Sequence, residues 1–543
     1  MCYHPPMDLR TPEGKLELGR RIHSAIAEAG FDSLPRFAQA LGCSRALIYQ
    51  YVKGDVLVQA DRLQHIGELT GRSLEWFFTP RHNGDCAETQ KLREELSQAR
   101  ARVEELEQAL SLSRGALAEQ DVRRRLESMD LLRRLCLALR RAGDAAGILE
   151  HAPRWRELAQ GLDDTASRLD AELQLAHAWF EAGEARRAEE AASRVIQEAE
   201  QGGLARTAQS ARQELVRALE AAGDMERARA EAARLAAEER WWPRWSGTVS
   251  LAALHERVGE LEAARAHLRA AAEVIEADWP STEYLALARA YLMSGRANVL
   301  LAAGDYRRAA EENEALRALA AQAGLADQLR EATLNAGIIA LRLGNLAEAE
   351  AELSRLADWA AMSADARTGA LAMAFQSELH RRSGDLAAAR LRAMAAVDAA
   401  TDAGRGHLLA EAELALGLVA TEEGRMDEAR YHLHRCRSRC EKLGLHKLGV
   451  AAHLALCRSG SEPAGDELQV ALAEAQRAGY ADLQADALVA LARHASPPET
   501  PDLCRRAIDL SREGGYFWAA QEAERLRDDR STAGHSQEVG RRS

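Results

Sequence analysis

Residues 377–389 have the sequence SELHRRSGDLAAA, and the pattern within it returns along most of the chain. The small residue Ser377 stands seven positions before Gly384, and Ala389 stands five positions after it. Asp385 directly follows the glycine, where a carboxylate meets the free backbone N–H groups of a beginning helix. Small residues at fixed distances on both sides of a turn let two antiparallel helices touch closely. The stretch therefore predicts a helical hairpin.

The hairpin pattern recurs with a period of about forty residues, as expected for a repeat array. Its turn glycines are Gly143, Gly183, Gly223, Gly259, Gly304, Gly344, Gly384 and Gly424. The alanine that follows each turn recurs as Ala188, Ala228, Ala264, Ala309, Ala349, Ala389 and Ala429, and only Ile148 departs from it. A second set of turns contains Gly203, Gly324, Gly404, Gly444, Gly479 and Gly515. About ten hairpins are predicted between Met129 and Arg527.

The spacing of these small residues resembles the tetratricopeptide pattern, in which a small residue and an alanine frame a glycine-containing turn. The period is longer than the usual tetratricopeptide length, which indicates slightly longer helices of the kind found in bacterial regulators and sensors. The resemblance implies a tetratricopeptide-like α-solenoid. The first helix of each pair would line its inner surface, where such proteins commonly receive peptides or partner proteins.

The composition limits the classes of function. The 543 residues carry a formal charge of −13, which argues against a protein that coats nucleic acid in general. Residues 1–80 contain nine Lys or Arg and nine Asp or Glu, so the acidity lies in the repeats. Eight scattered cysteines form no secreted disulfide framework and the start of the chain lacks a signal-peptide core, so we expect a cytoplasmic protein. No apolar run approaches the roughly 18 residues that cross a bilayer, so no membrane partner is expected.

No combination of residues typical of a catalytic site is present. The sequence has no phosphate-binding glycine loop, no nucleophile elbow and no His-Glu-x-x-His run. We therefore expect no enzyme activity, no catalytic residue and no cofactor. His432, Cys436 and Cys440, with His453 and Cys457 on the next helix, have a spacing at which zinc binding is conceivable. We favour buried cysteines that act as small hydrophobic residues, and expect no metal.

A segment ahead of the repeats departs from the repeat period and is predicted to form four or five short helices. Two of them lie over residues 34–41 and 45–52 and are separated by Gly42. Ser33 and Ser44 precede these helices, where a side-chain oxygen accepts hydrogen bonds from the first free N–H groups. The pattern predicts a helix-turn-helix.

The second of these helices is predicted to present a polar face. Leu41 and Ile48 are assigned to the core. The residues left outside are Arg45, Ala46, Tyr49, Gln50 and Lys53. Arginine can bind guanine with two hydrogen bonds and glutamine can bind adenine in the same way, so the face suits the major groove of DNA.

This segment resembles the helix-turn-helix domains of the phage-repressor family, also called Cro-like or xenobiotic-response-element domains. The resemblance places Arg45 and Gln50 among the base-reading side chains, and Ser44 and Lys53 near phosphates. With Tyr49 on the same face, these residues form the predicted DNA-binding site. The alternative is a small helical module kept for protein contacts, in which Arg45 and Gln50 are ordinary solvated residues.

Between these two parts, apolar residues alternate in steps of four and three, as at a coiled-coil seam. The predicted dimerisation residues are Leu92, Leu96, Val103, Leu106, Leu110 and Leu117. Such a seam would join two chains, and a homodimer would then bind double-stranded DNA at an inverted-repeat operator. The alternative is a single long helix packed on the first repeat.

Two asparagines are the predicted ligand-binding residues of the array. Asn298 and Asn335 stand six and nine residues before their turn glycines in adjacent repeats. The resemblance to tetratricopeptide proteins implies that asparagines near these positions grip the backbone of a bound peptide. The lysine that accompanies them in a carboxylate clamp is replaced by Ser294, and solvated or cap-forming asparagines are the alternative.

The predicted fold class is all-α, with a helix-turn-helix domain, a coiled-coil linker and an α-solenoid. The predicted boundaries are a disordered N-terminus at 1–14, the helix-turn-helix domain at 15–80, a linker at 81–90, the coiled-coil helix at 91–126, the repeats at 127–527 and a disordered tail at 528–543. This arrangement resembles peptide-responsive bacterial transcription regulators. The expected function is DNA-binding regulation controlled by a peptide or protein bound to the repeats, and the alternative is an adaptor that does not bind DNA.

Overall fold

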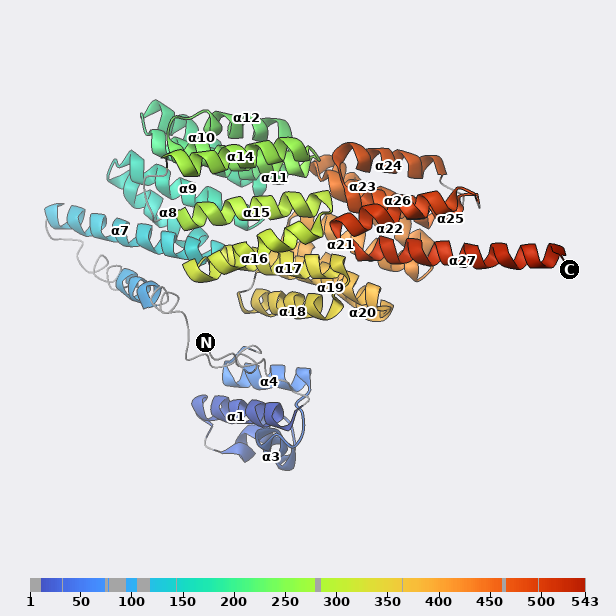
Figure 1. The fold of residues 1–543 in the computed structure, drawn as a ribbon. Coiled ribbons are helices and arrows are strands. Elements are labelled where there is room, and N and C mark those ends of the chain that lie inside the picture. Colours follow the sequence, from blue (N-terminus) through green and yellow to red (C-terminus); the bar gives the residue numbers. More distant parts are fainter. Residues whose placement is uncertain are drawn as a thin grey trace. The chain divides into compact units, whose positions relative to one another are not determined.

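The structure is a computed structural model that describes residues 11–31, 33–73, 77, 94–104, 118–142, 144–278, 285–363, 365–460, 465–496 and 498–542. The chain divides into two compact units, Met1–Ser97 and Gln98–Ser543 (Figure 1). The described residues form helices and turns and no strand, so the predicted all-α fold class is confirmed.

The first unit contains four described helices. They are α1 (Pro12–Glu28), α2 (Leu34–Ala40), α3 (Arg45–Lys53) and α4 (Ala60–Thr70). Its core includes Ile22, Phe37, Ile48, Ile66 and Phe77, whose side chains are fully buried. These apolar side chains hold α2 and α3 against α1 and α4.

Helix α1 begins before the predicted end of the disordered N-terminus at residue 14. Thr11 accepts a hydrogen bond from the backbone N–H of Gly14 at 3.1 Å, and Pro12 occupies the first turn, where its missing N–H is not needed. Both features start a helix, and they explain why the predicted boundary was wrong by a few residues. Residues 1–10 lie outside the described part of the chain.

The second unit is an array of helix pairs, stacked in the order of the sequence (Figure 1). Its helices are α7 (Ala118–Ala142), α8 (Ala145–Gly161), α9 (Thr165–Glu181), α10 (Ala185–Gln201), α11 (Ala205–Ala222), α12 (Met225–Ala236), α13 (Trp241–Arg257), α14 (Leu261–Asp278), α15 (Leu285–Ala303), α16 (Tyr306–Ala323), α17 (Ala326–Leu343), α18 (Leu346–Ser363), α19 (Ala366–Ser383), α20 (Leu386–Asp402), α21 (Gly406–Glu422), α22 (Met426–Leu443), α23 (His446–Ser459), α24 (Gly465–Ala478), α25 (Ala481–His494), α26 (Thr500–Gly514) and α27 (Phe517–Arg542). Within the described residues they form pairs from α7/α8 to α25/α26, followed by α27, which confirms the predicted solenoid.

Small residues let the two helices of each pair approach closely, as predicted. Ser377 and Ala389 are fully buried on the facing sides of α19 and α20. In α17, a Cβ atom on Gly337 would lie 2.8 Å from a methyl carbon of Leu353. A larger residue at these positions would force the pair apart, because real Cβ atoms do not come so close.

The acidic residue after the turn glycine caps the second helix where it is an aspartate. Asp385 accepts a hydrogen bond from the backbone N–H of Ala388 at 3.0 Å. Asp144 does the same for Gly147 at 2.8 Å. Glu184 stands at the equivalent position and its side chain makes no capping hydrogen bond. At this position aspartate therefore caps the helix and glutamate does not.

The turn glycines have a second role that the sequence pattern did not reveal. A Cβ atom on Gly183 would lie 2.3 Å from the backbone oxygen of Ala403, and one on Gly223 would lie 2.2 Å from that of Lys442. Pairs early in the array therefore touch pairs about two hundred residues later, backbone against backbone. The array coils upon itself, and we call these contacts the turn-to-turn seam.

Side chains across this seam cap helix ends. The Nε of Arg257 donates to the carbonyl oxygen of Leu443 at 3.1 Å, and the indole N–H of Trp518 donates to that of Leu341 at 2.7 Å. Both carbonyls lie in the last turn of a helix, where backbone oxygens lack partners within the helix. Donors from distant repeats therefore form hydrogen bonds across the seam with carbonyl oxygens at helix C-termini.

Two predicted boundaries differ from the structure. Helix α27 continues to Arg542, although a disordered tail was predicted from Asp528. The start of α27 is anchored by Ala519 and Ala523, which are buried, and extending an existing helix costs far less than nucleating one. Helix α7 runs through the predicted boundary at residue 127 without a break.

The coiled-coil segment is described only in part, as a helix over residues 94–104. Within it Leu96 is half-buried and Val103 is buried. The other predicted seam residues, Leu92, Leu106, Leu110 and Leu117, lie outside the described residues. Dimerisation through this segment stays a prediction.

Candidate functional sites: the α3 face and the cavity of the repeat array

The predicted turn between two helices is present at α2 and α3. Gly42 has a φ of 67°, a left-handed conformation that glycine adopts without strain. Ser44 accepts a hydrogen bond from the backbone N–H of Leu47 at 3.2 Å and so caps α3, which ends at Gly54. Ser33 has extended backbone but makes no side-chain cap bond, so this part of the prediction was wrong.

The predicted DNA-contacting residues share one property in the structure. All are exposed, and they are Ser44, Arg45, Tyr49, Gln50 and Lys53. The side chains of Arg45, Gln50 and Lys53 make no hydrogen bond or ion pair with any other described residue. Helix α3 contains no acidic residue, so its face presents two positive charges and an amide.

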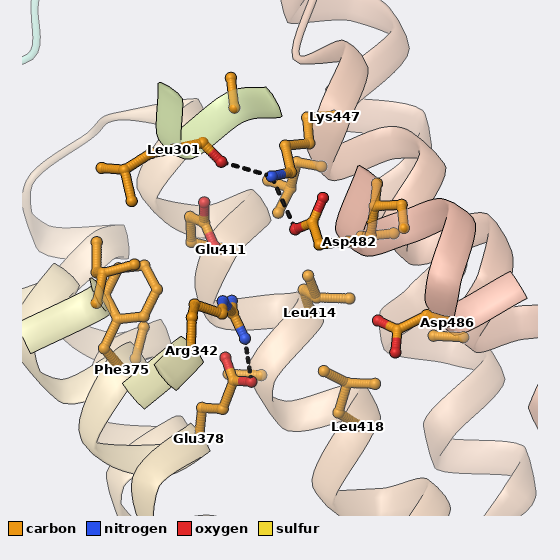
Figure 2. Close-up of a pocket in the computed structure, with 18 of the residues that line it drawn as sticks. Leu301, Arg342, Phe375, Glu378, Glu411, Leu414, Leu418, Lys447, Asp482 and Asp486 are labelled. Atoms are coloured by element: carbon orange, nitrogen blue, oxygen red, sulfur yellow. Dashed lines mark hydrogen bonds and ion pairs between the residues drawn. The ribbon is translucent and has the colours of Figure 1, made fainter. Parts of the chain in front are cut away.

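The array encloses a cavity of about 500 Å³. Most of the residues that line it belong to the first helices of the pairs, α13, α15, α17, α19, α21, α23 and α25, as predicted for the inner surface. Figure 2 shows that charged side chains such as Arg342, Glu378 and Asp482 share this wall with the apolar side chains of Phe375, Leu414 and Leu418. A mixed wall of this kind is typical of ligand sites.

Most of the cationic side chains of the wall lie within ion-pair distance of a carboxylate of the protein; Arg458 forms no such pair with a described residue. Arg342 donates to Glu378 at 2.5 Å, and Arg381 and Arg382 lie 3.5 and 3.6 Å from the same carboxylate. Burial alone would raise the pKa of Glu378, but these guanidinium groups outweigh it and lower the pKa to about 2. Glu378 is therefore ionised at neutral pH.

A second charged group lies across the cavity from the first (Figure 2). The ammonium group of Lys447 donates to the carbonyl oxygen of Leu301 and to Asp482, each at 2.8 Å. The hydroxyl of Tyr306 donates to the same Asp482 carboxylate at 2.5 Å. Lys447 thus joins α15, α23 and α25 across the turn-to-turn seam.

Two carboxyl groups of the wall have no such partner. Among the described residues, none forms a hydrogen bond or ion pair with the side chain of Glu256 or of Glu411. Burial raises the pKa of each carboxyl group to about 7. The positive charges of Lys447 and Arg257 near Glu256, and of Arg342 and Lys447 near Glu411, reduce this rise only in part. Both groups titrate near neutral pH.

The predicted asparagines lie in the wall of this cavity. Asn335 donates to the side-chain oxygen of Asn298 at 3.1 Å, and Asn298 donates to Glu331 at 3.1 Å. Ser294 also donates to Glu331, at 2.5 Å. Adjacent repeats thus place their amides side by side, and a role in ligand binding stays a prediction.

Sequence reasoning missed the charged groups of the cavity. Glu411 and Glu413 are the two charged residues of the otherwise apolar sequence LLAEAELALGLVA, residues 408–420, and a carboxylate on the inner face of this helix was the available signal. The pairing of Lys447 with Asp482 could not be foreseen, because it depends on how far the array coils. The seam, not the repeat period, brings these residues together.

The histidines and cysteines on α22 and α23, whose spacing made a zinc site conceivable, have other surroundings. Cys436 and Cys440 are buried in a small apolar cluster with Ala410 and Ala452. The Nε2 of His453 lies 3.1 Å from a carboxylate oxygen of Glu467. In the part of the chain that the structure describes, no group of three His, Cys, Asp or Glu side chains is arranged to hold a metal ion.

Among the described residues, no helix is long and apolar enough to span a bilayer.

No protein-family model matches this chain, and no curated protein matches it. Solved structures of helical-repeat proteins align with it at low identity. A Rap protein complexed with competence and sporulation factor aligns at 13% identity and a TM-score of 0.46, over 67% of this chain and 98% of that chain. The apo form of RapI aligns at 11% identity and a TM-score of 0.35, over 60% and 98%. Yeast Tom70 aligns at 12% identity and a TM-score of 0.28, over 73% and 96%.

Proposed function

We propose that this protein is a cytoplasmic, DNA-binding transcription regulator whose repeat array senses a peptide or protein partner. The observation that carries the proposal is the exposed, unpaired polar face of α3. Arg45 and Gln50 lie on a capped helix after a tight turn and have no partner among the described residues. Side chains left free in this way are available to bind base edges.

The chemistry of the α3 face suits sequence reading. Arg45 stands in the first turn and can bind guanine with two hydrogen bonds, while Gln50 can do the same with adenine. Each good pair discriminates against the wrong base by about 1–3 kcal/mol. Ser44 and Lys53 at the two ends of the helix are placed to contact phosphates, which fix the register of a protein on DNA.

A dimer would compensate for the small charge of this domain. Phosphate contacts supply most non-specific affinity, and a neutral domain makes few of them. Two domains joined through Leu92, Leu96, Val103, Leu106, Leu110 and Leu117 would bind together and require an inverted repeat. We include this homodimer in the proposal.

The array would act as the sensor. Its cavity is large enough for a small ligand and is lined by both polar and apolar side chains. The turn-to-turn seam ties early repeats to late ones, so a ligand that favours one coiling of the array would bias the whole unit. Only a difference in affinity between two shapes can produce such a response.

One observation favours the alternative, an adaptor without DNA contact. Leu34 packs against the core of the first unit, at a position where many phage-repressor domains have a phosphate-binding glutamine. In that case the repeats would assemble partner proteins and the α3 face would be an ordinary solvated surface.

Selection of bound fragments from a random DNA pool tests the proposal. We would run it with the full chain at about 50 mM and about 200 mM salt, because affinity for DNA depends strongly on salt. The proposal predicts an inverted-repeat consensus. Recovery of nothing above background at the lower salt would instead support the adaptor.

A further inference from the structure

We infer that the helix over residues 94–104, named the docking helix below, packs on the first repeat of the array, α7 and α8, and that this contact competes with dimerisation. The inference rests on the homodimer included in the proposed function, because the docking helix carries part of the predicted coiled-coil seam. It follows from which face of this helix is already covered within a single chain.

An ion pair places the docking helix at the start of the array. The guanidinium of Arg100 lies 3.7 Å from a carboxylate oxygen of Asp144, which stands in the turn between α7 and α8. The chain from Gln98 onward also belongs to the compact unit of the repeats and not to the first unit. Two observations thus assign the end of the docking helix to the first repeat.

The covered face of the docking helix is the predicted seam. Leu96, Ala99 and Val103 follow one another in steps of three and four, which places them on one face of a helix. Leu96 and Ala99 are half-buried and Val103 is only 9% exposed, whereas residues 101–102 and 104 are exposed. A lone helix of eleven residues cannot bury one of its own side chains to this extent. Other parts of the same chain therefore cover Val103.

A covered seam excludes a coiled coil. In a coiled coil each seam side chain inserts between four residues of the partner helix, so Val103 would have to leave its present surroundings. The chain therefore has two mutually exclusive states. One is a monomer with the docking helix on the first repeat, and the other is a dimer with the docking helix released. Dilution favours the monomer by mass action, because the dimer consumes two chains.

The competition acts on the proposed DNA binding. A docked monomer offers one α3 face, and a single neutral domain makes few phosphate contacts. Only the released state joins two such faces for one inverted repeat. The docking contact is therefore autoinhibitory, and weakening it should raise the share of dimer.

Amide hydrogen exchange, measured by mass spectrometry, tests the docking itself. Wild type is diluted until sedimentation velocity gives the mass of one chain, so that no coiled coil protects the helix. Residues 94–104 should then exchange at least about tenfold more slowly than in V103D, because a lone helix of this length is marginal in water. The control A101D places the same charge on an exposed face of the helix and should keep the slow exchange. Equal exchange in wild type and V103D would overturn the inference.

The dissociation constant of the dimer tests the competition. Asp144 also caps α8, but asparagine caps a helix as well as aspartate does, so D144N removes the charge that faces Arg100 and keeps the cap. We expect sedimentation velocity to give D144N a dissociation constant about two- to twentyfold lower than that of wild type, because a weak ion pair is lost from both chains. The matched control D164N changes the residue that caps α9 through the N–H of Ser167, and should leave the constant unchanged.

A dissociation constant of D144N equal to that of wild type, or the same shift in D164N, would overturn the competition. If wild type and D144N both stay monomeric at every concentration, the proposed homodimer fails and the competition fails with it. Slow exchange of residues 94–104 in wild type would still establish the docking in that case.

Discussion

Arg405 places its Nη2 nitrogen 3.0 Å from both the backbone oxygen and a carboxylate oxygen of Glu181, although the residues are 224 positions apart. The same nitrogen donates to the carbonyl oxygen of Phe180, and the guanidinium lies over the Phe180 ring. One side chain thus closes the turn-to-turn seam at its first contact. Burial would raise the pKa of Glu181, but Arg217 and Arg405 lower it below the usual value.

Replacing Arg405 by alanine should lower the free energy of unfolding by about 1–3 kcal/mol. The half-buried Glu181 carboxylate would keep only Arg217 as a partner and the Glu181 carbonyl oxygen would lose its donor, while the Phe180 carbonyl oxygen keeps the N–H of Gly183. Urea unfolding measures the change. Arg187, an exposed arginine of α10 paired with Glu184 three residues earlier, is the control, and R187A should cost at most about 0.5 kcal/mol. Equal costs for the two variants would mean that the seam contributes nothing.

Two turn glycines with similar backbone conformation allow the contact across the seam to be tested apart from the backbone strain of the turn. Gly183 and Gly384 have φ of 82° and 87°, but a Cβ atom on Gly183 would meet the backbone of Ala403 and one on Gly384 would meet nothing within 4 Å. G384A should cost about 1–2 kcal/mol, from left-handed strain alone. G183A should cost clearly more, measured by the same urea titration. Equal destabilisation would show that the backbone contact across the seam is absent.

The repeat period and the paired helices could be predicted because they depend on local rules. Gly384, Asp385 and Ala389 each act within one hairpin, and the same rules apply in every repeat. The seam could not be predicted, because the distance between Arg405 and Glu181 depends on small rotations added over many pairs. The same limit applies to the cavity, where Lys447 and Asp482 meet through the seam. The exposed face of α3 was predictable, since the apolar residues of one short helix determine it.

Stability should depend on pH through Glu411. Its pKa is about 7 in the folded protein, above the ordinary value of 4.5, so the folded state binds the proton more tightly than the unfolded state. The contribution of Glu411 to stability is therefore fully present below about pH 4.5 and is lost as pH rises through about 7. The variant E411Q cannot ionise at this position, so its stability does not fall in this pH range. Its free energy of unfolding should exceed that of wild type by about 1–3 kcal/mol at pH 8 and should be nearly equal to that of wild type at pH 4. Urea unfolding of both proteins at pH 4 and pH 8 measures these free energies. The same difference between E411Q and wild type at both pH values would refute the prediction.

The oligomeric state tests the proposed coiled coil. Sedimentation equilibrium of the full chain should give twice the mass of one chain, because Leu106 and Leu110 would lie in a shared apolar seam. The variant L106D/L110D should give the mass of a single chain while its helical circular dichroism is nearly unchanged. A wild-type chain that remains monomeric would instead favour a single helix packed on the first repeat.

The most direct test of the regulator proposal is fluorescence-anisotropy titration of the DNA site obtained by selection, at one stated salt concentration. The variant R45A/Q50A should lose about tenfold to a thousandfold in affinity for that site, and should bind it no better than unrelated DNA. The control variant R20A removes a largely exposed arginine of α1, so it loses one positive charge just as R45A/Q50A does. It should bind the site like wild type. If R45A/Q50A keeps the wild-type preference for the site, α3 does not read DNA and the proposal is contradicted.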